Sequence, residues 1–530
     1  MTAETGWAID TLNWGLPGVP LDPEPPGAET FCATPLLDLL ETAAGRSPDA
    51  IALTSWTARL TYRALLDRVR DVAASVVACV PAGGTIACLL PRSPDGVAAV
   101  LGCLVSGRVC LIADPDYPAE RLATLLADAA PDALLTAVPM PFDNVPIVLN
   151  LDRISGRTVN NRRRPAGTWD PDAPSAVHFT SGSSGRPKGI VLSARSILYR
   201  ALHTSTGMNT SPDDRIFTLT SHVTSANLAM ILGGLLRGAR ILVANIVTEG
   251  INTVLRLFER EAVTLMTGTA PVLRTLLAMP RARAAFGAVR LMRAGGVSIA
   301  GTDLAAWRPV LPSTCAIQHA YSSTEALVVA VWIVPPEADA RPGGVPSGVL
   351  QSVHDYAILD PDGRPVPFGE PGELVLRGRY LALGEWVGGR LVPGPMMPAP
   401  GRPGARIFRT GDLVRIAPDG IMRVLGRADR QIKVNGVRIE PAEIEAVIRT
   451  DPRVTDAVAV LSSGTAAPEL FGFALSDDPD TAELVAALRR RLAQALPTAA
   501  RPARLIVLTA FPMLSSGKID LAALSRWARD

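Results

Sequence analysis

The chain has 530 residues, of which 48% are hydrophobic, and its formal net charge at pH 7 is +2. That length exceeds what one hydrophobic core normally supports, so we expect two to four domains. The near-neutral charge, without an acidic or basic tail, argues against a general nucleic-acid-binding protein.

In chain order, an irregular arm rich in Pro and Gly over residues 1–33 precedes two α/β stretches. In both, short apolar runs alternate with helical patterns, which is typical of parallel βαβ units. The first stretch predicts helices at 36–42 and 65–78 and strands at 85–90 and 109–113. The second predicts strands at 176–179, 215–219, 239–243 and 263–266.

Over residues 345–427 the helical pattern fades, and Gly- and Pro-rich turns separate short alternating runs such as 373–377. This pattern predicts a β-rich subdomain. The final hundred residues return to mixed α/β patterns, with helices expected at 441–449 and 481–496. Residues 387–404 have a biased composition, rich in Gly and Pro, and we expect them to form an exposed, mobile loop.

Other sequence features exclude further classes of protein. The N-terminus carries acid and lacks a basic start followed by an apolar run, so no secretory signal is predicted. The longest apolar stretch, residues 97–113, is interrupted by polar residues and is too short to span a bilayer. Six cysteines without a CxxC pair are typical of a reduced, cytoplasmic protein, and five histidines without metal-ligand spacing argue against structural zinc.

The basic residues have an unusual composition. Of 52 lysines and arginines, only Lys188, Lys433 and Lys518 are lysines. A compact, rotatable ammonium and a planar guanidinium serve different purposes. Each lysine is therefore a candidate for chemistry that arginine cannot perform.

Lys188 lies at the end of the segment SAVHFTSGSSGRPKG, residues 175–189. A predicted strand leads here into a loop dense in glycine and hydroxyl groups. Such a loop can direct backbone N–H groups and hydroxyls at phosphate oxygens, while the lysine neutralises their charge. The Walker pattern GxxxxGK[ST] is absent here and around Lys518.

The segment TSGSSGRPKG resembles the nucleotide loop of the adenylate-forming superfamily, which includes acyl- and aryl-CoA ligases, nonribosomal-peptide adenylation domains and luciferases. Further segments resemble that superfamily in the same order. They are LTYRALL (60–66), LVSGRVCLIADPDYPAERL (104–122), AYSSTEA (320–326), GELVLRG (372–378), FRTGDL (408–413), GRADRQIKVNGVRIEPAEIE (426–445) and LSSGKID (514–520). The resemblance covers roughly residues 34–525.

The resemblance implies an α/β fold. Its large N-terminal domain, residues 34–428, would hold two stacked α/β sheet subdomains and a small β-barrel-like subdomain, and a small mobile α+β domain would follow at 429–530. It also implies an enzyme that joins a carboxylate to the α-phosphate of ATP, with Mg²⁺ as cofactor, and then transfers the acyl group to a thiol. Because carboxylate and phosphate are both anionic, catalysis must neutralise charge and align the reactants.

By the same resemblance, Thr324 would contact the α-phosphate, and Glu325 would ligate Mg²⁺, a hard ion that suits carboxylate oxygen. The other residues expected to bind the nucleotide belong to the same motifs. They are Thr180, Ser181, Ser183, Ser184 and Lys188 for the β- and γ-phosphates, Tyr321, Gly295 and Gly296 for adenine, and Asp412 with Arg427 for the ribose hydroxyls.

The other two lysines match segments near the C-terminus. Lys518 matches the family lysine that bridges carboxylate and phosphate during adenylation. Lys433 follows Asp429, where the family has the hinge about which its C-terminal domain swings between half-reactions. The Lys433 loop would face the site during thioester formation; a structural role in that hairpin is the alternative.

Residues 218–243 form the expected acid-binding segment. Adenylation domains for α-amino acids place an Asp early in it, because a buried ammonium without a partner is costly. One alignment puts Ser225 at that position. Another, which matches His222 to the PxxH of acyl- and aryl-acid ligases, puts Val223 there. No Asp or Glu occurs between residues 218 and 247.

The other expected pocket residues are small or apolar: Ala226, Ala229, Gly268, Met292, Ala294, Ala320, Val328 and Val329. We therefore predict a carboxylic acid without a free α-amino group, such as a small acyl, aryl, hydroxy or keto acid. His222 would gate the pocket or touch the carboxylate, or else pack beside the acid tunnel. A β-amino or other unusual amino acid held by a displaced anchor is the alternative substrate.

For the acceptor thiol, QIKVNGVRIEPAEIE and DPDYPAERL resemble carrier-protein-loading domains more than CoA ligases. The chain ends soon after Lys518, so we expect a free-standing enzyme of natural-product biosynthesis that loads a separate phosphopantetheinyl carrier protein. CoA is the alternative acceptor. A catalytically silent nucleotide-binding homologue is a further alternative, against which the joint presence of Lys188, Glu325, Asp412 and Lys518 argues. We predict no nucleic-acid or membrane partner.

Overall fold

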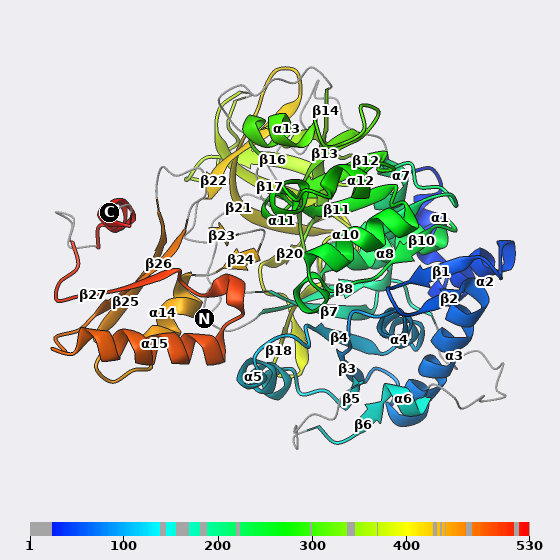
Figure 1. Ribbon diagram of the computed structural model, residues 1–530, viewed down its shortest axis with the longest axis horizontal. Coiled ribbons are helices and arrows are strands. Elements are labelled where there is room, and N and C mark those ends of the chain that lie inside the picture. The colour runs from blue at the N-terminus through cyan, green and yellow to red at the C-terminus, as the bar shows by residue number, and fades with distance from the viewer. Residues whose placement is uncertain are drawn as a thin grey trace. The chain divides into compact units, whose positions relative to one another are not determined.

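The computed structural model describes residues 24–137, 145–154, 169–180, 188–218, 223–296, 299–335, 345–367, 369–427, 432–434, 437–439, 441–462, 469–512 and 519–528. The chain divides into two compact units (Figure 1). Unit 1 comprises Met1–Asp114, Ala129–His178 and Gly189–Ala428, and unit 2 comprises Pro115–Asp128, Phe179–Lys188 and Asp429–Asp530.

An eight-stranded sheet has the strand order β19-β18-β8-β7-β4-β3-β5-β6. Its strands are β3 (Thr85–Leu89), β4 (Val109–Ala113), β5 (Ala133–Thr136), β6 (Val148–Asn150), β7 (Pro174–Thr180), β8 (Lys188–Ser193), β18 (Gly384–Val387) and β19 (Arg390–Val392). The neighbours from β7 to β6 pair in parallel. Every residue of β3, β4 and β5 is buried, which explains why these strands are nearly unbroken apolar runs.

The larger sheet has fourteen strands. Its strands are β1 (Ile51–Thr54), β2 (Arg59–Thr61), β9 (Arg215–Thr218), β10 (Arg240–Leu242), β11 (Leu265–Thr269), β12 (Leu291–Gly295), β13 (Ala316–Ser323), β14 (Leu327–Val334), β15 (Gly348–Leu350), β16 (Asp355–Leu359), β17 (Gly372–Gly378), β20 (Met396–Pro398), β21 (Arg406–Ile416) and β22 (Ile421–Arg427).

The larger sheet changes character along its length. Strands β1, β10, β9, β11, β12 and β13 are parallel neighbours. From β13 onward, β14, β15, β22, β21, β17 and β16 pair antiparallel. The pairing of β15 with β22 therefore makes most of the β-rich segment predicted over residues 345–427 a continuation of this sheet. Its strands β18 and β19 instead join the eight-stranded sheet beside β8.

The helices of unit 1 pack on these sheets in layers. They are α1 (Ala28–Ala33), α2 (Leu36–Arg46), α3 (Tyr62–Cys79), α4 (Pro94–Val105), α6 (Leu151–Ile154), α7 (Ala194–Gly207), α8 (Ser225–Leu236), α9 (Ile246–Glu249), α10 (Ile251–Glu261), α11 (Ala270–Leu277), α12 (Ala282–Ala285) and α13 (Gly301–Trp307). The main core joins α3, α4, α7 and α8 to strands of both sheets. A second core, the outer core, packs α10 to α13 against the larger sheet.

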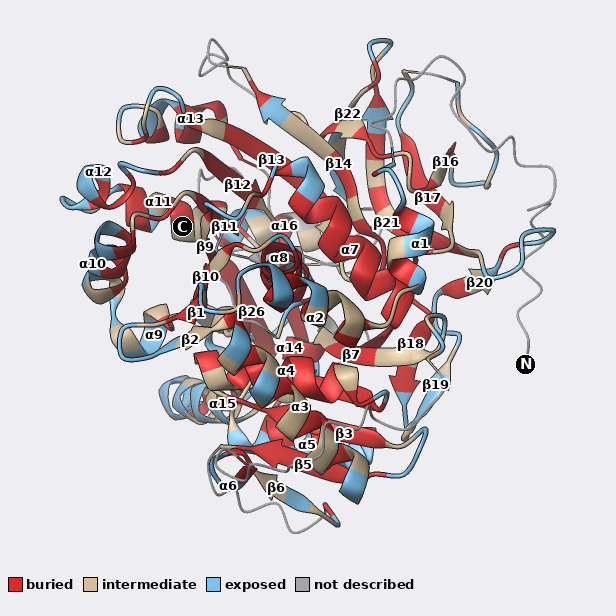
Figure 2. Cartoon of the chain, turned by 90° about the vertical axis from the view of Figure 1, so that its right-hand side faces the viewer, coloured by how far each residue is buried: buried red, intermediate tan, exposed pale blue. Residues whose placement is uncertain are grey.

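Helices α7 and α8 are buried along most of their length (Figure 2). A helix that is apolar all round, as α8 is, needs such a position between packed layers. Both begin at a hydroxyl cap: the Ser193 side chain accepts from the backbone N–H of Ser196, and that of Thr224 accepts from Asn227.

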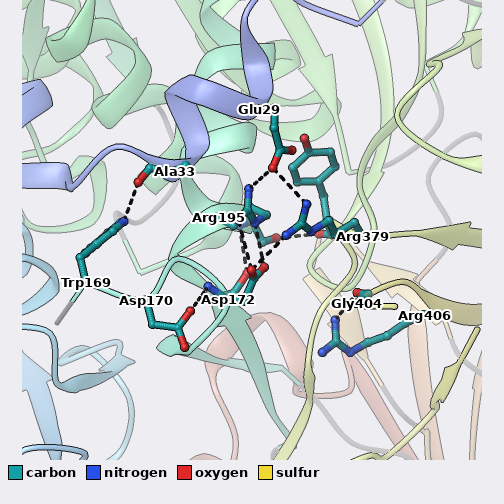
Figure 3. A network of polar contacts seen from close by, with 12 residues as sticks. Glu29, Ala33, Trp169, Asp170, Asp172, Arg195, Arg379, Gly404 and Arg406 are labelled. Atoms are coloured by element: carbon teal, nitrogen blue, oxygen red, sulfur yellow. Dashed lines mark hydrogen bonds and ion pairs between the residues drawn. The ribbon is translucent and has the colours of Figure 1, made fainter. Parts of the chain in front are cut away.

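A ring of four alternating charges fastens α1 to the rest of unit 1 (Figure 3). The guanidinium of Arg195, on α7, donates two hydrogen bonds to Asp172 and one to Glu29, on α1. Arg379 donates to the same two carboxylates. The hydrogen bonds from Arg195 hold the pKa of Asp172 below its ordinary value.

Unit 2 has its own α/β core. Its elements are α5 (Ala119–Ala129), β23 (Ile432–Val434), β24 (Val437–Ile439), α14 (Pro441–Ile448), β25 (Asp456–Leu461), β26 (Leu470–Leu475), α15 (Thr481–Ala495), the 3-10 helix η2 (Thr498–Ala500), β27 (Arg504–Leu508) and α16 (Leu521–Trp527). Alternate residues of β25 face opposite sides of the sheet, as the pleat of a strand requires. Ala457 and Ala459 pack with α14 and α15, whereas Val458 and Val460 pack with α16.

The strands and helices predicted from the sequence are present, with ends shifted by a few residues. Two expectations were wrong. Residues 28–33, assigned to an irregular arm, form α1. The segment 387–404 was expected to be an exposed, mobile loop; most of its residues are exposed, but it contains β19 and β20. Gly388 and Gly389 both adopt positive φ and close a tight hairpin between β18 and β19.

All six cysteines are free, and all but Cys79 are buried. Within the described ranges, none of the helices combines the length and the apolar character needed to cross a bilayer.

Candidate active site

Several expected site residues converge at one edge of the larger sheet. Strands β11, β12 and β13 are parallel neighbours whose register pairs Gly268 with Ala294 and Gly295 with Ala320. These positions lie at the carboxyl ends of the strands. In open α/β sheets, ligands bind outside that edge.

The glycines expected beside adenine have local reasons to be glycine. A Cβ atom added to Gly295 would lie 3.3 Å from the backbone oxygen of Ala320, which is closer than ordinary contact. Gly296 has φ +79°, in the left-handed region that residues with side chains rarely adopt. Both positions therefore favour glycine over a residue with a Cβ atom.

The residues expected to bind adenine and ribose are bonded to one another. Asp412 of β21 lies opposite Arg427 of β22 in the strand register. The Arg427 guanidinium donates to one carboxylate oxygen of Asp412 at 3.0 Å, and the Tyr321 hydroxyl donates to the other. Burial and the charge of Asp412 raise the pKa of Tyr321 well above its ordinary value, so its hydroxyl keeps its proton. A carboxylate has about four acceptor positions, so Asp412 can still accept ribose hydroxyls.

The turn between β13 and β14 carries the two residues expected at the α-phosphate and Mg²⁺. Glu325 is buried and Thr324 is half-buried. The Ser225 hydroxyl donates to the Thr324 hydroxyl at 3.5 Å, although the two residues are 99 positions apart. This contact joins the expected acid-binding segment to the expected α-phosphate residue. Carboxylate and hydroxyl oxygens are hard donors, and their chemistry suits Mg²⁺.

Neither alternative anchor position carries a negative charge. Ser225 is buried at the start of α8, and Val223 is half-buried just before it. The backbone oxygen of Val223 lies 2.6 Å from the ring Nδ1 of His178. Because a carbonyl oxygen can only accept, Nδ1 carries the proton and donates. Burial lowers the pKa of His178 to about 4, so the ring is neutral at pH 7.

The remaining expected pocket residues differ in exposure. Ala226 is exposed and Val328 is half-buried. Those that are buried are Ala229, Gly268, Met292, Ala294, Ala320 and Val329. Met292 and Ala294 belong to the outer core of unit 1.

The two described ends of the loop expected to bind phosphate belong to unit 2. Thr180 ends β7 and Lys188 begins β8. The Thr180 hydroxyl donates to the Lys188 carbonyl at 3.5 Å, which brings the two ends of the loop together. Lys433 is central in β23 and pairs with Arg438 of β24. Ser181, Ser183, Ser184, His222, Asp429 and Lys518 lie outside the described residues, as does the side chain of Lys433.

Three buried residues beside these positions were not identified from the sequence: His178, Arg200 and His354. His178 interrupts the apolar run 176–179 of β7, which was the only signal for it. Arg200 and His354 lie on segments far in sequence from the turn at residues 323–326, which they contact. Nothing in the local sequence pattern indicates those contacts.

Comparison with known proteins gives consistent results. The family model described as AMP-binding enzyme matches residues 40–386. A dimodular nonribosomal peptide synthase of Bacillus subtilis (strain 168) is 29% identical over 507 residues. That alignment covers 92% of this chain and 21% of the synthase, so the chain spans about a fifth of that relative's length.

Two solved structures share the fold. An artificially fused adenylation–PCP di-domain nonribosomal peptide synthetase from Klebsiella oxytoca has a TM-score of 0.79 and 21% identity, covering 90% of this chain and 87% of that one. An o-succinylbenzoate CoA synthetase from Bacillus subtilis has a TM-score of 0.78 and 20% identity, covering 92% of this chain and 98% of that one.

Proposed function

The chain belongs to the AMP-binding enzyme family, and from that premise we propose that it activates a carboxylic acid lacking a free α-amino group and loads it onto a carrier protein. The family makes it an adenylate-forming enzyme of the acid–thiol ligase type. The identity of the acid, the acceptor thiol and the roles of individual residues are our proposals.

The proposed reaction has two steps. In the first, a carboxylate oxygen attacks the α-phosphorus of ATP, the bond to the β-phosphate oxygen breaks, and pyrophosphate leaves. In the second, a thiol sulfur attacks the acyl carbon, AMP leaves, and the thiol proton passes to solvent. In the first step the attacking carboxylate and the phosphates are all negatively charged, and in the second step the thiol attacks beside the phosphate of AMP. Aligning the reactants and neutralising this charge therefore supply most of the catalysis.

We propose a role for each of the residues expected to bind the nucleotide, the metal ion or the reacting groups. Asp412, supported by Arg427 and Tyr321, would accept the ribose hydroxyls, and Thr324 would contact the α-phosphate. Glu325 would hold Mg²⁺, which neutralises phosphate charge when bound. The remaining phosphate contacts would come from the loop, with Thr180, Ser181, Ser183, Ser184 and Lys188. Lys518 would bridge carboxylate and phosphate in the first step, and Lys433 would serve the second, after movement about Asp429.

One observation carries the proposed substrate class. Val223 and Ser225, the two alternative anchor positions, are both uncharged, and the nearby His178 is neutral. An α-ammonium buried there would lack the carboxylate partner that its desolvation requires. A carboxylic acid with an apolar, hydroxy or keto substituent carries no such cost. An unusual amino acid held by a displaced anchor is the alternative.

A carrier protein is the proposed acceptor because the C-terminal motif resembles carrier-loading domains. The names of the relatives support this choice: one is a dimodular peptide synthase and another contains an adenylation–PCP pair. CoA is the second candidate, because a CoA synthetase shares the fold.

ATP–pyrophosphate exchange with a broad panel of acids tests the proposal. We expect exchange to depend on an acid without an α-amino group. Incubation of the enzyme with ATP, that acid and either a phosphopantetheinyl carrier protein or CoA, followed by mass measurement, then identifies the acceptor. If α-amino acids gave the fastest exchange, the proposed substrate class would be rejected. If none of the acids in the panel stimulated exchange, a catalytically silent homologue would be favoured.

A further inference from the structure

Arg200 supports the turn that carries Thr324 and Glu325. It lies on α7, and only 6% of its surface is exposed. One guanidinium nitrogen donates to the backbone oxygen of Thr324 at 2.6 Å, and the other donates to that of Ser323 at 3.4 Å. A single buried side chain therefore binds two successive carbonyls of the turn.

The next two carbonyls are also bound from outside the hairpin. The backbone oxygen of Glu325 accepts from the N–H of Ala382 at 2.9 Å. The backbone oxygen of Ala326 lies 2.8 Å from the Nε2 of His354, which donates because a carbonyl can only accept. Four consecutive carbonyls, from residue 323 to residue 326, thus bind donors that other segments supply.

The hairpin has an irregular backbone that makes such support necessary. Its register shifts between Tyr321 and Ser322. Leu327 follows the turn with φ 65°, in the left-handed region that a residue with a side chain adopts only at a cost. Unusual backbone conformations persist when the surrounding structure determines them, and they are concentrated at functional sites.

The guanidinium remains charged in this buried position. Burial lowers the pKa of Arg200 to about 9, and the carboxylate of Glu325 opposes this shift. Burial also lowers the pKa of His178 and of His354, each to about 4, so both rings are neutral at pH 7. Hydrogen bonds from a charged donor are roughly twice as strong as those between neutral groups.

We propose that Arg200 is a positioning residue, which together with His354 holds the carbonyl side of the 323–326 turn against the core so that Thr324 and Glu325 can meet the Mg²⁺–nucleotide. This inference rests on the roles given to those two residues in the proposed function.

The chemistry of arginine explains its use at this position. A planar guanidinium presents donors in a fixed fork that reaches two carbonyls at once, whereas an ammonium is a compact point charge on a flexible stem. Arg200→Lys should therefore keep the charge and lose the two-carbonyl geometry, and Arg200→Met should lose both.

Arg293 offers a matched control. It is also buried, with 6% of its surface exposed, and burial lowers its pKa to about 10. Its Nε donates to the Gln318 side chain at 2.9 Å. Arg293→Lys should thus disturb a buried arginine of the same unit without touching the turn.

The test is titration calorimetry of MgATP binding to the full chain, with thermal midpoints and the KM values for MgATP and for the acid. We expect Arg200→Lys and Arg200→Met to weaken MgATP binding by roughly 10- to 100-fold, the range for losing hydrogen bonds from a charged group. The KM for MgATP should rise more than the KM for the acid. Arg293→Lys should change the affinity for MgATP by no more than about twofold from that of the wild-type protein. This should hold even if its thermal midpoint falls as much as those of the Arg200 variants.

Unchanged MgATP binding in a folded Arg200 variant would overturn the inference, and so would an equal loss in Arg293→Lys. If the Arg200 variants do not accumulate as folded protein, His354→Asn tests the same support from the Ala326 side: weaker binding is expected, and unchanged binding overturns the inference. Wild-type protein that fails to bind MgATP would instead reject the proposed function, and the inference with it.

Discussion

The two sides of the candidate site in unit 1 are built on opposite principles. On the side proposed to bind the nucleotide, Arg427 and Tyr321 each donate to one carboxylate oxygen of Asp412, so a charged network holds that carboxylate in place. On the side proposed to bind the acid, Val223 and Ser225 are uncharged, and each contacts a neutral group, His178 and Thr324 respectively. The nucleotide is the same for every member of such a family, so the side chains that bind it can be held in one fixed arrangement. The side proposed to bind the acid is characterised by the lack of a carboxylate at either alternative anchor position.

The two sides are nevertheless supported alike. Each has one buried, neutral histidine bonded to one backbone carbonyl: His354 to Ala326 on the nucleotide side, and His178 to Val223 on the acid side. The difference between the sides therefore lies in the charge presented to the ligand, and the backbone is held in place on both.

The largest effect should come from Lys518, which we propose to bridge the carboxylate and the phosphate in the first step. Lys518→Ala should reduce adenylate formation by about 1,000-fold, because it removes the charge that we propose brings carboxylate and phosphate together. Thioester formation from a synthetic acyl-adenylate should be largely retained. Pyrophosphate exchange and single-turnover thiolation measure the two steps.

Lys433→Ala is the paired control and should show the opposite bias, with thiolation the more impaired step. Equal loss in both half-reactions for either lysine variant would contradict its assignment to one step.

Asp412→Asn should affect the nucleotide side alone. The substitution removes the charge that Arg427 and Tyr321 hold in place, and we expect MgATP binding to weaken by roughly 10- to 100-fold. The KM for the acid should change much less. Kinetics with each substrate varied in turn measure this split, and a parallel rise in both KM values would show that the two sides are not separate.

A carboxylate added to the acid side should do the reverse. Val223→Asp and Ser225→Asp should each lower kcat/KM for the preferred acid by about tenfold, through burial of a charge, with little change in the KM for MgATP. The variant that gains stimulation by α-amino acids identifies which alignment locates the anchor. If Ser225→Asp damaged MgATP binding as much as acid binding, its contact with Thr324 would belong to the nucleotide side.

The smallest effect concerns the two histidines. Burial lowers the pKa of each from 6.5 to about 4, so the unfolded chain takes up protons first as the pH falls below 6.5. Their contribution to stability is present above pH 6.5 and is lost as the pH falls toward 4. Between about pH 7 and pH 5.5, each should cost roughly 1 kcal/mol of the free energy of unfolding.

Urea unfolding at the two pH values measures this loss. His178→Gln and His354→Gln should each lose less stability over the same interval than the wild-type protein. An unchanged pH dependence in both variants would show that neither histidine is buried in the neutral form.

The sequence alone predicted most of the features that depend on local pattern, although it missed α1 and the hairpin between β18 and β19. Strand β4 and helix α14 could be located from apolar periodicity, and Asp412 and Arg427 could be named from their motifs. The bond from Tyr321 to Asp412 joins residues 91 positions apart, and Arg200 contacts a turn more than a hundred residues away. Such contacts depend on how the strands are ordered in the sheet, which periodicity does not reveal.

The most direct test of the contrast between the two sides is ATP–pyrophosphate exchange with matched sets of acids. Each set holds one α-amino acid and the 2-hydroxy, 2-keto and unsubstituted acids with the same side chain. We predict that within the best set the α-amino acid gives the slowest exchange, because Val223 and Ser225 offer its ammonium no carboxylate. Fastest exchange with the α-amino acid would contradict the account.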